Sequence, residues 1–578
     1  MTNTPMDTTD APRVHDCDLL VVGTGAGGLS TAVTAAIAGL DVLVVEKAPV
    51  FGGTTARSGG WLWIPGNRHA RDAGFQDSKE EARTYLQHEA GNHFDPDRVD
   101  AFLDAGPEMV DFFEKNTSVR FVLGPTFADY HPDAPGGKDG GRSICAEPFD
   151  ARGLGGNVKN LRPPLREITF LGMMIGSGKE LLHFFNVTRS PVSMAFVARL
   201  LARYGSDRLL HGRGMRLTNG NALAGRLAKS AFDLGVPIWL SSPAKELLVE
   251  DGRVVGAVIA KPDGEVRVRA RRGVVLAAGG FPWDLDRRRR LFPHAPTGRE
   301  HYTPAPETNT GDGLRLGEAV GGRGQSELPN AAAWVPVSQV PRRDGSFGVF
   351  PHFVDRSKPG VIAVNRHGRR FVNEANSYHD FVQAMRASYD ASDPGEVCGW
   401  FVCDHKTIRR YGLGFAKPAP LPLRPYLKSG YLVRGDTPEE LARNAGFDPA
   451  AFRATLDAFN GPARRGEDPE FHKGSTSYNR SLGDPDHQPN PCVAPVEQGP
   501  FYAVKVVVGD LGTFAGLRTD RYARVLRAQD GSPIDGLYAV GNDMGSIMGG
   551  NYPGGGITLG PAMTFGYIAA RHAAGRIG

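Results

Sequence analysis

A glycine cluster near the start of the chain restricts the possible folds more than any other feature. It reads Gly23-x-Gly25-x-Gly27-Gly28 and follows the apolar run DLLVV, which has the composition of a buried parallel strand. A helix of small residues and a second apolar run come next, and Glu46 ends that run. In such a βαβ unit, glycines permit a tight turn and a close approach to a pyrophosphate, and the helix N-terminus attracts the anion. Because Glu46 can accept a hydrogen bond from a ribose hydroxyl, the pattern predicts dinucleotide binding.

Two further segments favour a flavin over a nicotinamide. A second glycine-rich loop directly follows Glu46-Lys47, and a flavin needs such a loop because its isoalloxazine end lies along the backbone. Near the other end of the chain, GLYAVGNDMG reads as a strand followed by a glycine and an acid, and a helix from about Gly560 is expected to direct its N-terminus at the flavin. We therefore expect FAD, held by Gly23, Gly25, Gly27, Gly28, Glu46, Lys47, Gly53, Thr54, Ser58, Gly59, Gly60, Gly279, Gly541, Asn542, Thr558 and Leu559.

The length of the chain predicts more than one domain, because 578 residues are too many for one ordinary core. We predict an α/β fold in which a Rossmann-like FAD-binding domain is built from both chain ends, residues 1–285 and 499–578. An α+β catalytic domain, residues 286–498, is inserted between these two parts. The runs AKELLVEDGRVVGAVIA and VRVRARRGVVLAAGGF are expected to form hairpin strands within the first part.

Two other segments have simpler interpretations. Residues 151–205 form an excursion that contains the amphipathic stretch VSMAFVARLLARYG. We expect a packing or oligomer helix there, with a lid over an apolar substrate as the alternative. The run Arg287–Arg290 follows two aspartates, and we interpret it as a solvated helix face rather than a binding patch.

Composition and charge exclude several classes of protein. The formal net charge is only +4 without a long basic block, so nucleic-acid binding is not expected. Five widely spread cysteines without a C-x-x-C pair argue against a disulfide framework and a zinc site, and no metal is expected. The first 17 residues lack the apolar run of a signal peptide, and no stretch of about 18 apolar residues offers a membrane span. We therefore expect a cytoplasmic protein, with peripheral contact to a membrane left open.

Several motifs give the chain a family resemblance. They are the Gly23 cluster with the loop after Glu46, the element Phe127-Ala-Asp-Tyr130, the stretch RFVNEANSY that ends at Tyr378, and NYPGGG over 551–556. With these, the chain resembles the flavoproteins related to the fumarate reductase flavoprotein subunit, and more closely the bacterial 3-ketosteroid Δ1-dehydrogenases. The resemblance runs over most of the chain and is weakest over 151–205 and 382–498. It implies FAD-dependent desaturation of a 3-ketosteroid next to its ketone, with a separate electron acceptor.

The resemblance also implies the catalytic residues. The family's general base is the tyrosine that ends the stretch above, which is Tyr378 here, and a second tyrosine, Tyr130, supports it. Because an unperturbed tyrosine has a pKa of about 10, a hydrogen bond donated by Tyr130 is expected to lower the pKa of Tyr378. In the family's Tyr-Pro-Gly-x-Gly motif, the tyrosine hydroxyl and the later glycine N–H bind the ketone oxygen. This implies an oxyanion hole made of Tyr552 and the Gly556 amide, with hydride passing to flavin N5.

The same motif separates two branches of the superfamily. Soluble fumarate reductases carry Asn-Arg-Leu-Gly-Gly-Asn there, and their arginine clamps a carboxylate. This chain has Tyr552 at that position, and a phenol cannot replace a guanidinium as a bidentate partner. We expect an apolar cyclic ketone, with a different cyclic ketone, a different ring-A bond (Δ4) or a fumarate- or enoate-type reduction as alternatives. Val508 and Phe514 replace a Pro and a Lys that ketosteroid dehydrogenases often carry, so the exact substrate stays open.

Neighbouring polar residues are given structural roles. His131 and His379 lie next to two of the tyrosines in the sequence, and a proton relay is the alternative for both. Asn373 and Glu374 are expected to organise the loop that holds Tyr378.

Overall fold

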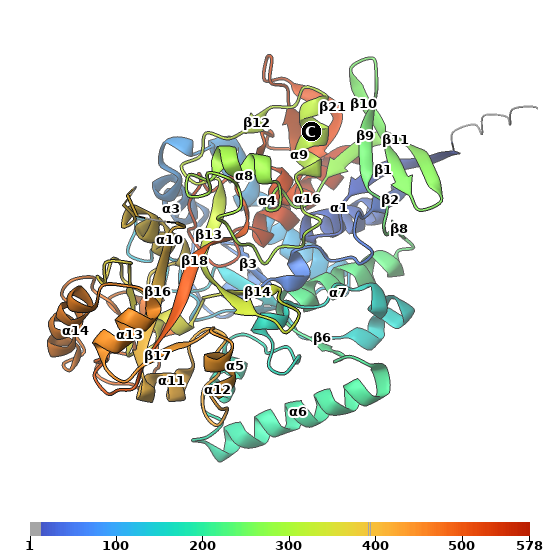
Figure 1. Ribbon diagram of the computed structural model, residues 1–578. Coiled ribbons are helices and arrows are strands. Elements are labelled where there is room, and N and C mark those ends of the chain that lie inside the picture. The colour runs from blue at the N-terminus through green and yellow to red at the C-terminus, as the bar shows by residue number, and fades with distance from the viewer. Residues whose placement is uncertain (1–12, 391, 394) are drawn as a thin grey trace, which may run out of the picture.

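The first sheet joins strands from both ends of the sequence, in a computed structural model that describes residues 13–578 apart from 391 and 394. Its strands run in the order β20 (Arg524–Leu526), β21 (Pro533–Ala539), β11 (Gly264–Leu276), β1 (Arg13–Val22), β2 (Val42–Val45) and β8 (Ile238–Trp239). β1 pairs in parallel with β2 and β11, and β11 pairs in parallel with β21. Blue and red ribbons therefore lie together in one layer (Figure 1), and the predicted α/β fold class is confirmed.

Helices of small residues cover this sheet closely. α1 (Ala26–Ile37) packs against α16 (Leu559–Ala573) and α7 (Asn219–Asp233). A Cβ on Gly566 of α16 would lie 2.7 Å from the carbonyl oxygen of Gly27 in α1, so only a glycine permits this approach. The predicted hairpin strands are confirmed as β9 (Ala244–Glu250) and β10 (Arg253–Lys261), which continue antiparallel into β11.

A second sheet is antiparallel. Its order is β14 (Phe347–Pro351), β13 (Ala332–Pro341), β18 (Phe501–Thr513), β16 (Cys398–Asp404) and β15 (Val361–Val364), with β17 (Val433–Gly435) also paired to β18. α10 (Tyr378–Ala387) packs against β13. The central strand, β18, follows residue 498 in the sequence, while the other strands precede it; the domain boundaries expected at 285 and 498 stay predictions.

Smaller elements complete the architecture. A third sheet has the order β3 (Trp61–Trp63), β5 (Ser143–Ala146) and β4 (Phe121–Leu123), beside the helices α3 (Lys79–Ala90) and α4 (Pro96–Asn116). Other helices are α9 (Asp312–Ala319), α11 (His405–Tyr411), α12 (Arg424–Lys428), α13 (Pro438–Ala445), α14 (Pro449–Ala463) and α15 (Ser477–Leu482).

The excursion at 151–205 contains the predicted helix, which is α6 (Pro191–His211). It is preceded by the 3-10 helix η3 (Ala151–Asn160) and by α5 (Lys179–Phe185). α6 lies along the outer edge of the molecule, below the rest of the chain in Figure 1. Among the described residues, none of the helices combines the length and the apolar character that crossing a bilayer requires.

The interpretation of Arg287–Arg290 as a solvated face was wrong for one residue. The run lies in α8 (Leu285–Leu291), where Arg289 and Arg290 are exposed, but Arg288 is buried. Its Nη1 donates to the carbonyl oxygens of Gly298 and His301, both at 3.3 Å. A buried guanidinium is tolerated when backbone carbonyls accept from it, and these acceptors come from a loop that the helical pattern does not reveal.

Candidate functional site

One cavity at the ends of the parallel strands collects most of the residues that the sequence assigns to the cofactor. It is bounded by the turn after β1, by the end of β2 and by the first residues of α1 and α16. The predicted residues that line it are Gly23, Gly25, Gly27, Glu46, Lys47, Gly53, Thr54, Ser58, Gly279, Gly541, Asn542, Thr558 and Leu559. Gly28, Gly59 and Gly60 lie outside the lining.

Two glycines make the turn after β1 possible. Gly23 has φ of +115°, and a Cβ on it would lie 2.2 Å from the carbonyl oxygen of Ala277 on the neighbouring segment. A Cβ on Gly28 would lie 2.0 Å from the carbonyl oxygen of Gly23. Gly28 therefore acts as predicted, by letting the helix approach the strand, although it does not line the cavity.

The cavity receives two helix N-termini. The N-cap residues are Gly25 for α1 and Thr558 for α16, and neither gives its helix a side-chain cap. The first N–H groups of a helix lack intrahelical carbonyl partners and carry partial positive charge. Two such ends in one elongated cavity suit a ligand with a pyrophosphate and, further along, electron-rich ring carbonyls. The residues present therefore fit FAD.

Glu46 is buried at the end of β2 and already has partners within the chain. Its Oε1 accepts from the N–H of Ala48 at 2.8 Å, and its Oε2 accepts from the N–H of Thr24 at 3.1 Å and from the Thr24 hydroxyl. Sequence reasoning missed further lining residues, among them Thr24, Thr55, Arg162, Ser242 and Leu511. Thr24 lies inside the glycine cluster and was within reach of the motif. Arg162 and Ser242 come from segments without a motif, and only the fold brings them here.

Three predicted tyrosines lie in one buried cluster. The Tyr130 hydroxyl donates to the Tyr378 hydroxyl at 2.9 Å. The Tyr552 ring stacks on Tyr130 at 5.4 Å between centroids and meets the Tyr378 ring edge-on at 5.0 Å. A fourth phenol, Tyr478 on α15, lies 4.5 Å from the Tyr130 ring and was not predicted. The four phenols come from segments that are distant in the sequence, so no spacing in the sequence reveals Tyr478.

The loop of Tyr552 and Gly556 is held against the loop of Tyr130. The carbonyl oxygen of Pro553 accepts from the Tyr130 N–H at 2.8 Å and from the Tyr85 hydroxyl at 2.6 Å. Gly556 has φ of +106°, and a Cβ on it would lie 2.5 Å from the carbonyl carbon of Trp61. Among the described residues, no carbonyl or side chain accepts from the Gly556 N–H. A free amide two residues before Thr558 is placed to bind an oxygen beside the cofactor cavity.

Aromatic side chains surround this cluster. The Phe353 ring contacts Tyr378 at 5.4 Å, and the Phe514 ring lies 6.1 Å from Tyr552. A Cβ on Gly555 would lie 2.2 Å from the Phe127 ring. These surroundings suit an apolar ligand, and Phe514, which replaces the family's frequent lysine, contributes to them directly.

Burial opposes ionisation of every phenol in the cluster. Burial, together with the neighbouring Tyr130 and Tyr552, raises the pKa of Tyr378 well above its ordinary value. Burial raises the pKa of Tyr552 to about 12. The predicted hydrogen bond between Tyr130 and Tyr378 is present, but the expectation that it lowers the pKa of Tyr378 is wrong for the chain alone, because burial and, to a smaller extent, the contact with Tyr130 itself raise this pKa.

Arg356 is a buried cation next to this cluster. Its Nη1 donates to the carbonyl oxygens of Glu374, at 2.5 Å, and Asn376, just before α10 begins. Its charge acts against the effect of burial on Tyr130, whose pKa is nevertheless raised, and it also lowers the pKa of Tyr478 relative to burial alone. Arg356 thus both fixes the loop before Tyr378 and places a positive charge behind the phenols.

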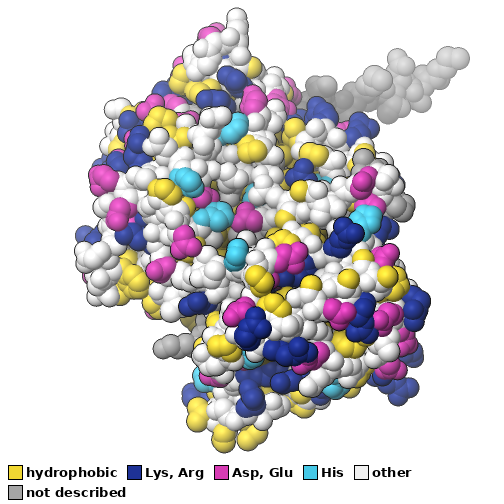
Figure 2. All heavy atoms as spheres, turned by 90° about the vertical axis from the view of Figure 1, so that its left-hand side faces the viewer, with side chains coloured by type: hydrophobic (Ala, Val, Ile, Leu, Met, Phe, Trp, Pro, Cys, Tyr) yellow, Lys and Arg dark blue, Asp and Glu magenta, His cyan; other side chains and the backbone are white. Residues whose placement is uncertain are grey.

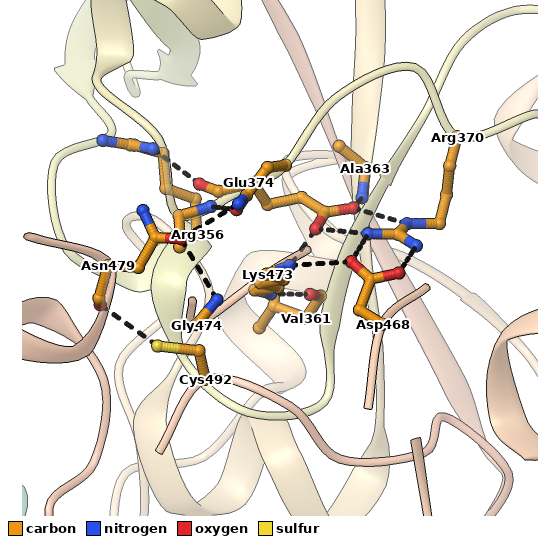
Figure 3. Close-up of polar contacts among 12 residues, drawn as sticks. Arg356, Val361, Ala363, Arg370, Glu374, Asp468, Lys473, Gly474, Asn479 and Cys492 are labelled. Atoms are coloured by element: carbon orange, nitrogen blue, oxygen red, sulfur yellow. Dashed lines mark hydrogen bonds and ion pairs between the residues drawn. The ribbon is translucent and has the colours of Figure 1, made fainter. Parts of the chain in front are cut away.

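A buried ion cluster supports the same loop (Figure 3). Arg370 makes bidentate contacts with Glu374 and with Asp468, all at 2.8–2.9 Å, and Lys473 lies 3.7 Å from Glu374. Glu374 also accepts from the N–H of Ala363 in β15 at 3.0 Å. Asn373 donates to Asn479 at 2.9 Å. Glu374 and Asn373 therefore organise the loop, as the sequence predicts.

The two histidines have different partners. His131 bridges Glu89 at 2.9 Å and Asp380 at 2.7 Å; burial opposes protonation, but the two carboxylates raise its pKa to about 10. His379 is fully buried, its Nδ1 accepts from the Trp334 N–H at 3.1 Å, and burial lowers its pKa to about 4. His131, as a charged bridge, and His379, as a neutral acceptor, both hold neighbouring groups in place.

Comparison with known proteins agrees with these features. A profile of the family described as the FAD binding domain matches residues 18–559. The chain is 45% identical over 559 residues to 4-oxocyclohex-2-ene-1-carboxylate 5-dehydrogenase of Sinomonas cyclohexanicum, covering 96% of this chain and 94% of that protein. It is 40% identical over 582 residues to 3-oxosteroid 1-dehydrogenase of Mycobacterium tuberculosis, covering 98% and 99%. The crystal structure of 3-ketosteroid Δ1-dehydrogenase from Sterolibacterium denitrificans with 1,4-androstadiene-3,17-dione matches with a TM-score of 0.89 at 37% identity, covering 97% of this chain and 100% of that one.

Proposed function

This chain belongs to the FAD binding domain family, and from that premise we propose that it desaturates the 1,2 bond of a 3-ketosteroid, next to the ketone. The protein is an FAD-dependent oxidoreductase, and its relatives act on 3-ketosteroids or related cyclic ketones. The observation that carries the proposal is the contact of Tyr378, Tyr130 and Tyr552 beside the free N–H of Gly556.

Each of these groups has a task in the reaction. The Tyr552 hydroxyl and the Gly556 N–H hold the ketone oxygen while negative charge develops on it, and one such donor contributes about 3 kcal/mol in the transition state. The Tyr378 oxygen takes the proton from the α carbon, and Tyr130 keeps that oxygen oriented through the 2.9 Å hydrogen bond. FAD, when bound, supplies the acceptor for the hydride that leaves the β carbon. A separate electron acceptor is needed to complete the cycle.

Anaerobic titration of the yellow holoenzyme with androst-4-ene-3,17-dione tests the proposal. Flavin bleaching is expected, and Tyr378→Phe or Tyr552→Phe should slow it by about 100-fold or more, because each variant removes a group acting in the transition state. Tyr522→Phe is a matched control, since Tyr522 packs on His572. Bleaching at the normal rate in both site variants would overturn the residue assignment.

A smaller cyclic ketone with a carboxylate is the second candidate, favoured by Lys417. Its Nζ lies 5.5 Å from the ring centre of Phe350 and 5.4 Å from that of Phe415, and burial lowers its pKa to about 8. Phe350 precedes Phe353, which contacts Tyr378, by three residues. The charge of Asp355 acts on Lys417 but forms no salt bridge with it among the described residues, so a ligand carboxylate can serve as its partner.

The wild-type protein and the variant Lys417→Met together distinguish the two substrate classes. If 4-oxocyclohex-2-ene-1-carboxylate is the substrate, Lys417→Met lowers kcat/KM for it by about tenfold or more and leaves any ketosteroid activity unchanged. If the ketosteroid is the substrate, the wild-type protein turns it over and the carboxylate fails to bleach the flavin.

A further inference from the structure

A second cavity lies beneath α6, apart from the cofactor site. It has a volume of about 390 Å³ and shares no lining residue with the cofactor cavity. Part of its wall is apolar and is formed by residues such as Leu161, Pro163, Met173 and Leu200. This volume lies within the range of about 300–1,000 Å³ that is usual for small-molecule sites.

Cations line the same cavity. Lys159, Arg208 and Arg213 form no ion pair with any carboxylate of the described residues, and the first two are exposed. Arg216 is paired with Glu180 at 2.7 Å and Arg203 with Asp150 at 3.6 Å. Arg213 is half-buried, its Nη1 donates to the carbonyl oxygen of Val158 at 2.7 Å, and burial lowers its pKa. A guanidinium that is drawn away from water without a counter-ion gains free energy when an anion joins it.

The lining contains one acid, Asp207, against five basic side chains. Asp207 is buried, and its Oδ2 accepts from the N–H of Met215 at 3.0 Å. The cavity thus combines an apolar interior with an excess of positive charge, and neither a neutral nor a purely ionic ligand satisfies both.

The outer surface of α6 has the same mixed character. Val192, Leu209 and Leu210 are 71%, 89% and 77% exposed, and the arginines of α6 lie between them in the sequence. On the face shown in Figure 2, Lys and Arg side chains and hydrophobic ones gather on the lower part of the molecule, which in Figure 1 carries α11 and α12 as well as α6.

We propose that the cavity beneath α6 binds an amphipathic anion, a molecule with an apolar chain or ring system and a single carboxylate or phosphate. The apolar part fills the space between Leu161, Met173 and Leu200, and the charged head is held by Arg208 and Arg213. A free fatty acid and an anionic lipid share this chemistry.

Binding of 11-(dansylamino)undecanoate to the FAD-loaded protein tests the site. Saturable fluorescence enhancement is expected, with displacement by dodecanoate and not by dodecanol. The double variant Arg208→Gln/Arg213→Gln should weaken binding by about tenfold or more, because hydrogen bonds to a charged group are lost. Leu200→Trp should abolish binding by filling the cavity while the charges remain.

Arg152→Gln is the matched control for removed charge. Arg152 is exposed, pairs with Asp150 and does not line the cavity. Its variant should bind the probe normally, and the flavin spectrum of each variant reports whether the chain is folded. Equal weakening in Arg152→Gln, or normal binding in Leu200→Trp, would overturn the site.

Vesicles distinguish the two sources of the ligand. If the anion is a lipid, the protein sediments with vesicles of phosphatidylcholine and phosphatidylglycerol, and Leu200→Trp reduces that sedimentation. If the anion is a free acid, dodecanoate binds but the protein does not sediment with the vesicles. Sedimentation that Leu200→Trp leaves unchanged, without binding of dodecanoate, would show a surface contact of α6 alone and contradict the proposal.

Discussion

Tyr378 is the proposed base, and its surroundings oppose its ionisation. Burial and the neighbouring phenols raise its pKa, and Arg356 supplies the positive charge that acts in the other direction on Tyr130 and Tyr478. Asp380, His379 and His131 face the same region from α10 and the loop of Tyr130. The charge on the Arg356 guanidinium therefore acts on Tyr378 through Tyr130, the phenol that shares a hydrogen bond with it.

This arrangement predicts a dependence on pH. Because the base acts deprotonated and its pKa is raised, the rate of flavin reduction should increase with pH across the alkaline range. Arg356→Met removes a positive charge that acts on Tyr130, the hydrogen-bond partner of Tyr378, so we expect this rise to move to higher pH, with about a tenfold loss of rate at a given pH for each unit moved. Stopped-flow flavin reduction from pH 6 to 10 measures the shift.

The conservative variant separates charge from structure in that experiment. Arg356→Lys keeps the charge but removes the guanidinium whose Nη1 donates to two carbonyl oxygens, so its pH profile should stay close to the wild type even if its rate falls. Identical displacement of the profile in both variants would show that the loop, and not the charge, sets the pH dependence.

The turn between β1 and α1 is the element whose geometry the sequence predicted best. The glycine motif, the strand before it and the helix after it are local, and a local pattern is sufficient because the backbone conformation at Gly23 allows few alternatives. The cluster of Tyr130, Tyr378 and Tyr552 was reached through a family resemblance, since its members are separated by more than 150 residues. Tyr478 and Arg356 were missed because only tertiary packing places them there.

Gly23→Ala tests how strictly this turn depends on glycine. With φ of +115° and a Cβ 2.2 Å from the carbonyl oxygen of Ala277, the new methyl group must displace backbone. We expect a colourless protein that retains less than about a tenth of its FAD, measured by absorbance at 450 nm against 280 nm. Gly461→Ala is the matched control: this glycine lies in α14, and a Cβ there meets no atom within 4 Å. Full flavin content in the Gly23 variant would contradict the role given to the turn.

At the scale of the whole molecule, the ion cluster of Figure 3 joins segments far apart in the sequence. Arg370 and Asp468 are separated by 98 residues, and both side chains are buried. No periodicity in the sequence predicts such a pairing, because charged residues are normally exposed on the protein surface. This is also why the interior of the inserted part was less predictable than the cofactor sheet.

Asp468→Asn should destabilise the protein strongly. It leaves the buried guanidinium of Arg370 with Glu374 and, at 3.9 Å, the exposed Glu470, and loss of one partner from a buried ion pair costs about 3–5 kcal/mol. The urea midpoint followed by tryptophan fluorescence should fall clearly. Glu439→Gln, which breaks the exposed pair with Arg453, should change stability by less than about 1 kcal/mol. Equal midpoints for the two variants would contradict the assigned importance of the cluster.

The sheet that combines β1 with β21 has a consequence for the order of events during synthesis. The wall formed by Gly541, Asn542, Thr558 and Leu559 leaves the ribosome more than 500 residues after the glycine turn that it faces. Until then, the nascent chain forms only part of the nucleotide pocket, and the edge of β11 that pairs with β21 has no partner strand. Flavin binding is thus expected to be a late step in biogenesis. A polypeptide that ends before residue 540 lacks this wall of the cavity and is expected not to bind the flavin.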